Sequence, residues 1–458
     1  MAVESLKELY KEQQTSALED YFTFLKFPSI SSEPEYKPHI QACVQWLAKY
    51  LQEMGFTTEL WPTSGHPTLF ATNLQAGPSQ PTLLIYNHYD VQPVDPLEAW
   101  HSPPFEPTIR NGQVYARGAQ DNKGQCFYVL QALRLLQKRD GKLPINIKLC
   151  IEGEEECGSA GLNEILASKK EQLKADYLAI VDLGIPGISS PAVTLGIRGI
   201  LAMDVEAVGS NTDLHSGCHG GLAYNPIKGL VEVLAKLYDS SGKVTIPGFY
   251  DDIIPIKEED KQQLALKFDA EEYESTFGAK PTGGEAGLSP LERNWVRPTL
   301  EINGITGGYA GAGFKTVIPA KASAKVSCRL VPGQDPDKVA QLVTVYIEKL
   351  APAGVKIRAH AHHGGGKAVR SRASGTAVIA FAQAFSEVFK SPCEYTLEGA
   401  SIPVVTNLAL AAEAEVVLLG LALSTDLIHA PNEHFGIDRI EKGCLVMARA
   451  IELLAKKS

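Results

Sequence analysis

The sequence predicts an α/β fold: a mainly parallel sheet with helices on both faces, interrupted by an inserted α+β domain. Three observations support this prediction. Apolar runs of strand length alternate with segments of helical periodicity over the first 190 residues or so, and again near the end of the chain. Between these stretches the pattern changes to several strand-like segments with few helices. The 458 residues are also too many for one ordinary hydrophobic core.

We therefore expect one domain formed by residues 1–198 and 369–458, and a second domain, 199–368, inserted into it. Glycine-containing segments at 196–199 and 364–366 are the expected hinges. Within the insertion, strands are expected at 201–208, 300–303, 322–330 and 355–360, and helices at 226–238 and 337–350. The Pro- and charge-rich stretch 240–298 is expected to be a long irregular excursion.

The first domain is expected to begin with an amphipathic helix over residues 1–14. Two helices around a polar loop are then expected across residues 16–60. Buried strands are expected at 82–90, 145–151, 177–182 and 416–423, because these runs are apolar and short. Helical periodicity predicts helices at 125–137 and 439–456.

Composition and charge restrict the possible partners. The formal net charge of -10 argues against nucleic acid or an anionic membrane as the main partner. The first residues contain no signal-peptide core, and the longest apolar run, 416–423, is too short to span a bilayer. The eight cysteines form no Cys-x-x-Cys pair, which is typical of reduced thiols, so a cytoplasmic protein is expected.

Histidine and carboxylate side chains follow the predicted strands of the first domain. His88 and Asp90 end the first strand, Asp182 ends another, and His429 lies just beyond the last. Four glutamates, 152 and 154–156, follow the strand at 145–151. The carboxyl ends of parallel strands form the ligand-binding edge of such a sheet, so these groups are expected to meet there.

Nitrogen and oxygen ligands without cysteine are typical of zinc or manganese sites. There are more carboxylates than one ion needs as ligands, which suggests two metals bridged by a carboxylate. Two of these features also have an ordinary structural interpretation. The glutamates could form a solvated acidic turn, and Asp121 could merely cap the helix that follows it. The sequence contains no Gly-x-Ser-x-Gly, phosphate-loop, Gly-x-Gly-x-x-Gly or His-Glu-x-x-His motif.

Taken together, several motifs resemble those of the carnosinase and cytosolic non-specific dipeptidase group of di-zinc exopeptidases, akin to carboxypeptidase G and the aminoacylases. The resemblance extends over essentially the whole chain. The matching motifs are Asn87-His-Tyr-Asp-Val-Gln-Pro93, Tyr115-Ala-Arg-Gly-Ala-Gln-Asp-Asn-Lys-Gly124, Glu152-Gly-Glu-Glu-Glu-Cys-Gly-Ser159, Asp213-Leu-His-Ser-Gly217, Lys315-Thr-Val-Ile-Pro319, Arg329-Leu-Val-Pro332 and His429-Ala-Pro-Asn-Glu433.

The resemblance implies a zinc-exopeptidase-like catalytic domain and an inserted lid and dimerisation domain. It implies two divalent ions, zinc with manganese or cobalt as alternatives, and a homodimer formed through the insertion. The implied metal ligands are His88 and Asp182 for one ion, Glu156 and His429 for the other, and Asp121 as the bridge.

The resemblance also implies roles for groups around the metals. Glu155 is the implied general base acting on a metal-bridging water, and Asp90 the residue that orients His88. His215, in the insertion, would stabilise the oxyanion in the partner subunit's site. The implied binders of the substrate's terminal carboxylate are Thr316, Arg329 and Ser401.

The chain departs from the family at 397–403, where it has Leu397 and Ala400 in place of an arginine and a glycine. The implied reaction is hydrolysis of dipeptides or short peptides with a free C-terminal carboxylate. The alternatives are an N-acyl-amino-acid deacylase on the same site and a catalytically silent scaffold. A further cluster, His360, His362 and His363, has metal-like spacing but is expected to be a surface feature.

Overall fold

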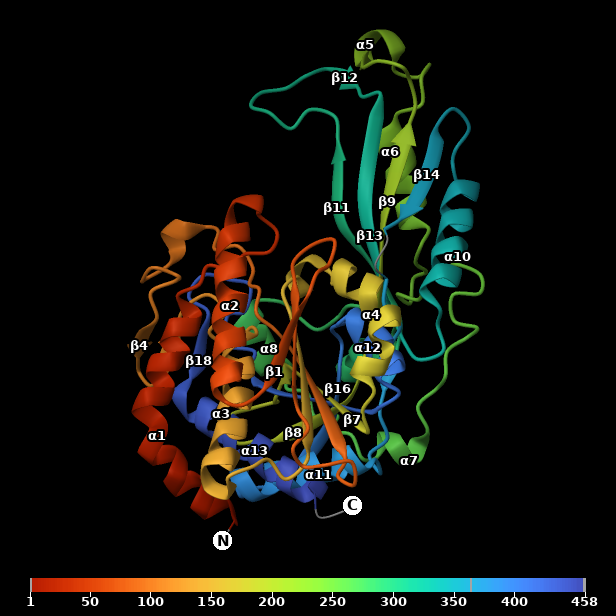
Figure 1. The fold of residues 1–458 in the computed structure, drawn as a ribbon. Coiled ribbons are helices and arrows are strands. Elements are labelled where there is room, and N and C mark those ends of the chain that lie inside the picture. The colour runs from red at the N-terminus through yellow and green to blue at the C-terminus, as the bar shows by residue number, and fades with distance from the viewer. Residues whose placement is uncertain (1, 363–364, 456–458) are drawn as a thin grey trace. The chain divides into compact units, whose positions relative to one another are not determined.

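Four parallel strands form the centre of the first of two units into which the chain divides. The computed structural model describes residues 2–362 and 365–455 (Figure 1). The first unit contains residues 2–195, 371–396 and 404–455 of these, and the second 196–362, 365–370 and 397–403. The sequence-based boundaries at 198/199 and 368/369 stay predictions. Residues 397–403, expected in the first domain, cluster with the second unit, where Gly399 and Ala400 bond Arg198.

In the main sheet of the first unit the strands lie in the order β1-β2-β6-β3-β7-β17-β8, with β16 beside β8. The neighbours β6, β3, β7 and β17 are parallel, and the outer pairs are antiparallel. A small separate sheet has the order β18-β5-β4. The predicted fold class is confirmed. The strands are β1 (Thr57–Trp61), β2 (Thr68–Asn73), β3 (Thr82–His88), β4 (Thr108–Arg110), β5 (Gln113–Tyr115), β6 (Asn146–Glu152), β7 (Tyr177–Gly184), β8 (Ala192–Ile197), β16 (Glu394–Glu398), β17 (Glu415–Ala422) and β18 (His434–Gly436).

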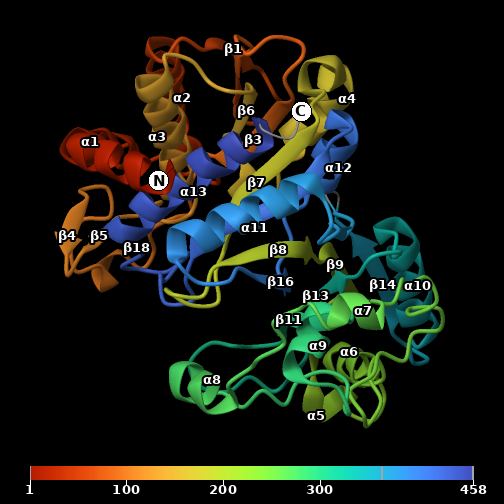
Figure 2. The ribbon, with the colours of Figure 1, turned by 90° about the horizontal axis from the view of Figure 1, so that it is seen from below.

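The helices of the first unit pack in two sets. Helices α1, α3, α11 and α13 contact one another in series, and α4 packs against α12; Figure 2 shows α11 running alongside α13. Because helices cover the sheet, β3 is buried along almost its whole length, as expected of a central parallel strand. The helices are α1 (Ala2–Leu25), α2 (Lys37–Glu53), α3 (Lys123–Asp140), α4 (Ala160–Leu173), α11 (Thr376–Phe389), α12 (Val404–Ala412) and α13 (Ile437–Ala455), with short 3-10 turns at Pro34–Tyr36, Leu97–Ala99 and Glu155–Cys157.

The second unit is built on an antiparallel sheet of order β11-β13-β9-β14. Buried and more exposed residues alternate along β9 and β13, because helices α6 and α10 cover only one face. That face and the two helices enclose the unit's hydrophobic core. The elements are β9 (Gly199–Val208), β10 (Leu214–His215), β11 (Thr299–Gly307), β12 (Val317–Ile318), β13 (Lys321–Leu330), β14 (Lys356–Ala361), β15 (Val369–Arg370), α5 (Ser216–His219), α6 (Pro226–Ala235), α7 (Glu258–Lys261), α8 (Ala270–Phe277), α9 (Pro290–Trp295) and α10 (Pro336–Lys349).

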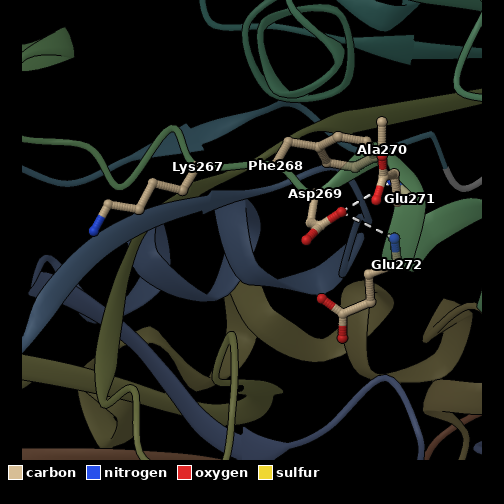
Figure 3. Close-up of a pocket in the computed structure, with 6 residues that line it drawn as sticks. All are labelled: Lys267, Phe268, Asp269, Ala270, Glu271 and Glu272. Atoms are coloured by element: carbon tan, nitrogen blue, oxygen red, sulfur yellow. Dashed lines mark hydrogen bonds between the residues drawn. The ribbon is translucent and has the colours of Figure 1, made fainter.

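The predicted excursion at 240–298 is irregular apart from the short helices α7, α8 and α9. A surface hollow at the start of α8 is lined by residues 267–272 (Figure 3). The Asp269 carboxylate accepts hydrogen bonds from the backbone of Glu271 and Glu272, so it caps the helix, and none of the predicted site residues lines the hollow. No helix within the described part of the chain is long and apolar enough to cross a membrane.

A buried ion pair anchors the loop between β17 and β18. The guanidinium of Arg439, on α13, donates to both carboxylate oxygens of Asp426, one at 2.7 Å, and both side chains are almost fully buried. Asp426 also accepts from the backbone of Leu423, and its own carbonyl accepts from His434. The two ends of the loop are therefore tied to the same residue.

Substituting Asp426→Asn should destabilise the protein strongly, since it leaves the Arg439 charge buried and uncompensated. Breaking such a pair costs about 3 kcal/mol or more. The matched control is Asp438→Asn, which breaks the exposed Lys442–Asp438 pair of the same helix and should cost below about 1 kcal/mol. Thermal melting of both variants checks this; equal melting temperatures would contradict the anchoring role.

Candidate metal centre

The five predicted metal ligands all lie in the first unit and converge. His88 ends β3, Asp182 lies near the end of β7, and Glu156 follows β6. His429 lies in the loop after β17, and Asp121 lies two residues before the start of α3. Because β6, β3, β7 and β17 are adjacent and parallel, their carboxyl ends bring these side chains to one edge of the sheet.

The first group of potential ligands comprises His88, Asp121 and Asp182. His88 Nε2 lies 3.1 Å from Asp121 Oδ1 and 3.6 Å from Asp182 Oδ1. The side chain of His88 is only 1% exposed and that of Asp182 9%. The other imidazole nitrogen of His88, Nδ1, lies 3.1 Å from the carbonyl oxygen of Asp90 and 3.3 Å from its Oδ1, which is the contact that the predicted orienting role of Asp90 requires.

The second group comprises Asp121, Glu156 and His429. His429 Nε2 lies 2.9 Å from Asp121 Oδ2 and 3.3 Å from Glu156 Oε2. Glu156 Oε1 is buried and has no hydrogen-bond partner. A buried carboxylate oxygen without a partner is costly, and a cation would relieve that cost.

Asp121 belongs to both groups through different oxygens, Oδ1 toward His88 and Oδ2 toward His429. Ligand atoms bound about 2.0–2.1 Å from a tetrahedral ion lie roughly 3.3 Å from one another. The nitrogen-to-oxygen distances in both groups, 2.9–3.6 Å, fit this spacing. The donor set is therefore suited to two divalent ions that share one carboxylate.

An irregularity in the sheet sets the position of Asp182. On β17, Leu419 pairs with Val181 and the next residue, Gly420, pairs with Leu183, so Asp182 is left unmatched in a bulge. Bulges commonly re-aim a side chain beside a functional site. The bulge requires glycine at 420, since a Cβ there would lie 1.7 Å from the Leu183 carbonyl oxygen.

The four glutamates after β6 divide into two pairs. Glu152 and Glu154 are buried and structural: Glu152 accepts from the Tyr86 hydroxyl at 2.6 Å, and Glu154 accepts from the backbone of His66 and Gly161. The alternative prediction, that the glutamates form a solvated acidic turn, is therefore wrong for Glu152 and Glu154.

Glu155 and Glu156 form the other pair, on the 3-10 turn. The carboxylate of Asp90 accepts hydrogen bonds from their backbone nitrogens at 3.2 Å and 3.1 Å. Asp90 therefore contacts His88 and also holds the turn that carries Glu155 and Glu156.

The electrostatics favour positive charge between the carboxylates. Burial raises the pKa of Glu155 well above its usual range, against the opposing effect of His88. Burial and the charge of Asp121 raise the pKa of Glu156 to about 7. Hydrogen bonds to Asp121 and Glu156 raise the pKa of His429 to about 10. All three shifts are in the direction that adds positive charge to this crowded set of acids.

Sequence reasoning missed the residues that hold these ligands. Asn122 donates to Asp182 Oδ1 at 2.6 Å and accepts from Asn87 at 2.6 Å, and both asparagines also bond the Val181 carbonyl. Gln92 donates to Glu156 Oε2 at 2.7 Å. All three lie in quoted motifs, but their partners are distant in sequence, so no local pattern identifies their roles.

The loop that carries His429 has an unusual backbone. Leu427, His429 and Asn432 have φ values of 56°, 59° and 66°, in the left-handed region that side chains other than glycine rarely adopt. Such residues persist where the surrounding structure holds them, often at functional sites. Asn432 contributes by accepting from the His101 backbone and donating to the Ala99 carbonyl.

The predicted residues of the insertion all lie in the second unit. His215 Nε2 lies 3.4 Å from the Thr316 hydroxyl, and both residues are exposed. The Ser401 hydroxyl is buried without a partner. Burial lowers the pKa of Arg329, and burial together with the charge of Arg329 lowers the pKa of Arg198 to about 10.

Arg198 holds the 397–403 segment. Its Nε donates to the Gly399 carbonyl at 2.8 Å and its backbone nitrogen to Ala400 at 3.1 Å. Leu397, at the family's arginine position, is buried. Arg198 therefore connects the surroundings of Arg329 with the segment that bears Ser401.

The histidine cluster at 360–363 is only partly described, because His363 and the hinge residue Gly364 lie outside the described residues. His362 Nε2 lies 3.0 Å from Asp204 Oδ2, and both side chains are about half exposed. Lys325 also contacts Asp204, so an ordinary surface ion pair accounts for the contact.

A mostly parallel α/β sheet with paired histidine–carboxylate groups at its carboxyl edge is typical of metal-dependent hydrolases. The profile described as "Peptidase family M20/M25/M40" matches residues 84–453, and the chain belongs to this family. It is 31% identical to a Cys-Gly metallodipeptidase DUG1 of Candida albicans over 99% of this chain and 96% of that one.

Two solved structures are similar over nearly the whole chain. The M20 family metallo-carboxypeptidase Sso-CP2 of Sulfolobus solfataricus is 32% identical, with a TM-score of 0.85 over 96% of this chain and 99% of that one. Human carnosine dipeptidase 1 is 28% identical, with a TM-score of 0.83 over 100% and 99%. The predicted resemblance to this group of metallopeptidases is confirmed.

Substituting the shared carboxylate should affect metal binding more than substituting an unshared one. Asp121→Ala removes an oxygen from both groups and should abolish binding of both ions, whereas Asp182→Ala should mainly lose one. Metal content after dialysis against a limiting zinc buffer distinguishes the variants, with the exposed Glu53→Ala as control. Equal retention in Asp121→Ala and Asp182→Ala would exclude the sharing.

Proposed function

We propose that this metallopeptidase hydrolyses the peptide bond of dipeptides or short peptides that have a free C-terminal carboxylate. The observation that supports this most directly is the pair of ligand groups sharing Asp121, with Glu155 on the adjacent turn. The similar proteins named above are a dipeptidase, a carboxypeptidase and a carnosine dipeptidase, which favours peptides over N-acyl amino acids.

His88, Asp182, Glu156 and His429, with Asp121 as the bridge, would hold two divalent ions, with zinc favoured and manganese or cobalt as alternatives. When bound, these ions polarise the scissile carbonyl and lower the pKa of a water molecule, so that the water can lose a proton and attack the carbonyl carbon near neutral pH.

Glu155 accepts a proton from the attacking water and delivers it to the leaving amine nitrogen. Its raised pKa suits this task, because a buried carboxylate among other acids binds a proton more tightly than a free glutamate. The backbone bond to Asp90 keeps Glu155 on the turn beside the ligand Glu156. A catalytically silent scaffold is disfavoured, since the base and every proposed ligand are present.

Substrate recognition would involve the second unit. The Arg329 guanidinium, with the hydroxyls of Thr316 and Ser401, would bind the substrate's terminal carboxylate. A guanidinium suits this role because it is planar and can donate two parallel hydrogen bonds to a carboxylate. The unpartnered Ser401 hydroxyl supports this, because a buried donor needs an acceptor. His215 would stabilise the oxyanion, and its proximity to Thr316 supports a shared task.

A cytoplasmic homodimer completes the proposal. The second unit presents strongly exposed apolar side chains, Leu222 at 82% and Phe314 at 90%, which are suited to burial against a partner. Each His215 would then act in the site of the partner subunit. The eight cysteines form no disulfide in the described structure, as expected for a reducing compartment.

The reaction is tested by assaying the zinc-, manganese- or cobalt-reconstituted protein on matched panels of dipeptides and N-acetyl amino acids. Dipeptides should be cleaved far faster. Glu155→Gln should lower kcat by about 10²- to 10⁴-fold with unchanged metal content, because only the proton acceptor is removed. Preference for N-acetyl substrates would favour the deacylase alternative, and normal turnover by Glu155→Gln would refute the assigned base.

Mixing two inactive variants tests the shared site. Homodimers of Glu155→Gln and of His215→Ala should both be nearly inactive, but in a mixed dimer one site receives intact Glu155 and His215. After subunit exchange about one quarter of wild-type activity should return, since half the dimers are mixed and each has one complete site. No recovery despite proven exchange would place His215 within its own subunit's site, and wild-type rates for His215→Ala would remove it from the mechanism.

A further inference from the structure

Glu433 is a fully buried carboxylate that the proposed reaction does not use. Its Oε2 accepts hydrogen bonds from Arg117 Nη1 and the Gly118 backbone nitrogen, both at 2.8 Å. Its Oε1 accepts from the backbone nitrogens of Gln120 at 2.9 Å and Asp121 at 3.0 Å. All four partners are donors, and all belong to the segment that ends at Asp121.

Glu433 also ends the loop that carries His429. A single side chain therefore joins two segments more than 300 residues apart, and these segments supply the ligand atoms Asp121 Oδ2 and His429 Nε2, which lie 2.9 Å from each other. We propose that Glu433 is a positioning residue of the metal centre: its carboxylate sets the position of Asp121 relative to His429. This inference rests on the proposed function only in assuming that the two groups bind metal.

Arg117 extends the connection to a third ligand segment. Besides its ion pair with Glu433, its Nη2 donates to the Pro93 carbonyl at 2.8 Å and its Nε to the same oxygen at 3.2 Å. Pro93 follows Gln92, the residue that bonds Glu156. Arg117 and Glu433 together thus connect the segments that position Glu156, Asp121 and His429.

The fold does not depend on this carboxylate alone. Strand β18, which starts at His434, pairs with β5, and the Glu433 carbonyl accepts from the Ala116 backbone nitrogen. These backbone contacts keep the two segments adjacent whatever the side chain at 433. What the carboxylate adds is an acceptor for the backbone nitrogens of Gly118, Gln120 and Asp121, and with it the placement of this segment.

Glu433→Gln tests this role with almost no change of shape. A glutamine has one oxygen and one NH2 group, so in either orientation the NH2 group faces two of the four donors and displaces them. We expect the Zn²⁺ affinity of the chelator-stripped full chain, measured by competition with a chromophoric chelator, to fall tenfold or more. Excess Zn²⁺ should restore most of the kcat, with KM little changed, a recovery that Glu155→Gln should not show.

The matched control is Glu387→Gln on α11, whose carboxylate accepts from Arg449 of α13 away from the ligand segments. It should bind Zn²⁺ within twofold of wild type. Wild-type Zn²⁺ affinity in folded Glu433→Gln would overturn the inference, as would an equal loss of affinity in Glu387→Gln.

If Glu433→Gln does not fold, Arg117→Lys replaces it. Lysine keeps the charge but cannot bond Glu433 and Pro93 together, so a smaller loss of Zn²⁺ affinity in the same direction is expected. Unchanged affinity in folded Arg117→Lys would overturn the inference. Absence of Zn²⁺ binding by the wild type would instead refute the proposed metal centre itself.

Discussion

Carboxylates that repel one another are held together at one edge of the main sheet. Asp121 lies close to Asp182 in one group of potential ligands and close to Glu156 in the other, with ligand atoms within 4.8 Å of one another in each group. Carboxylates this close and this buried are unfavourable unless positive charge lies between them. The proposed metal centre follows from this, because a cation is the simplest source of such charge and the spacing of the ligand atoms suits one.

The protein holds this arrangement through a surrounding layer of hydrogen bonds. Three of the five proposed ligands have a dedicated neighbour: Asp90 for His88, Asn122 for Asp182, and Gln92 for Glu156. The loop of His429 combines a left-handed backbone with the buried Asp426–Arg439 pair. The contacts that hold the acidic side chains close together thus come from several of the central strands and from the loops that follow them.

Much of this could be predicted from the sequence. The strands at 82–88 and 177–184 are apolar and end on chemically distinctive residues, so both their existence and their common edge follow from the pattern. The expected break between residues 14 and 16 is wrong: α1 continues from Ala2 to Leu25, because Thr15 and Ser16 do not interrupt a helix whose buried face contacts α3 and α13. Strand β1, at Thr57–Trp61, was also missed, since this half-exposed edge strand lacks a continuous apolar run.

What the sequence could not supply is long-range pairing. The bulge at Asp182 depends on which residues of β17 lie beside β7, and the role of Glu433 depends on a loop some 315 residues earlier in the chain. The local periodicity of the sequence predicts neither the pairing of β17 with β7 nor the contacts of Glu433. The same limit explains why Glu152 and Glu154 could not be separated from Glu155 and Glu156, since their distinguishing contacts, with Tyr86, His66 and Gly161, are made in the folded chain.

Anomalous diffraction at the zinc absorption edge, from crystals of the zinc-loaded protein, would locate the bound ions. If two ions share Asp121, two peaks should lie about 3.5–4 Å apart, one beside His88 and Asp182 and the other beside Glu156 and His429, with one oxygen of Asp121 directed at each. A single peak, or zinc bound away from Asp121, would rule out a shared two-ion centre.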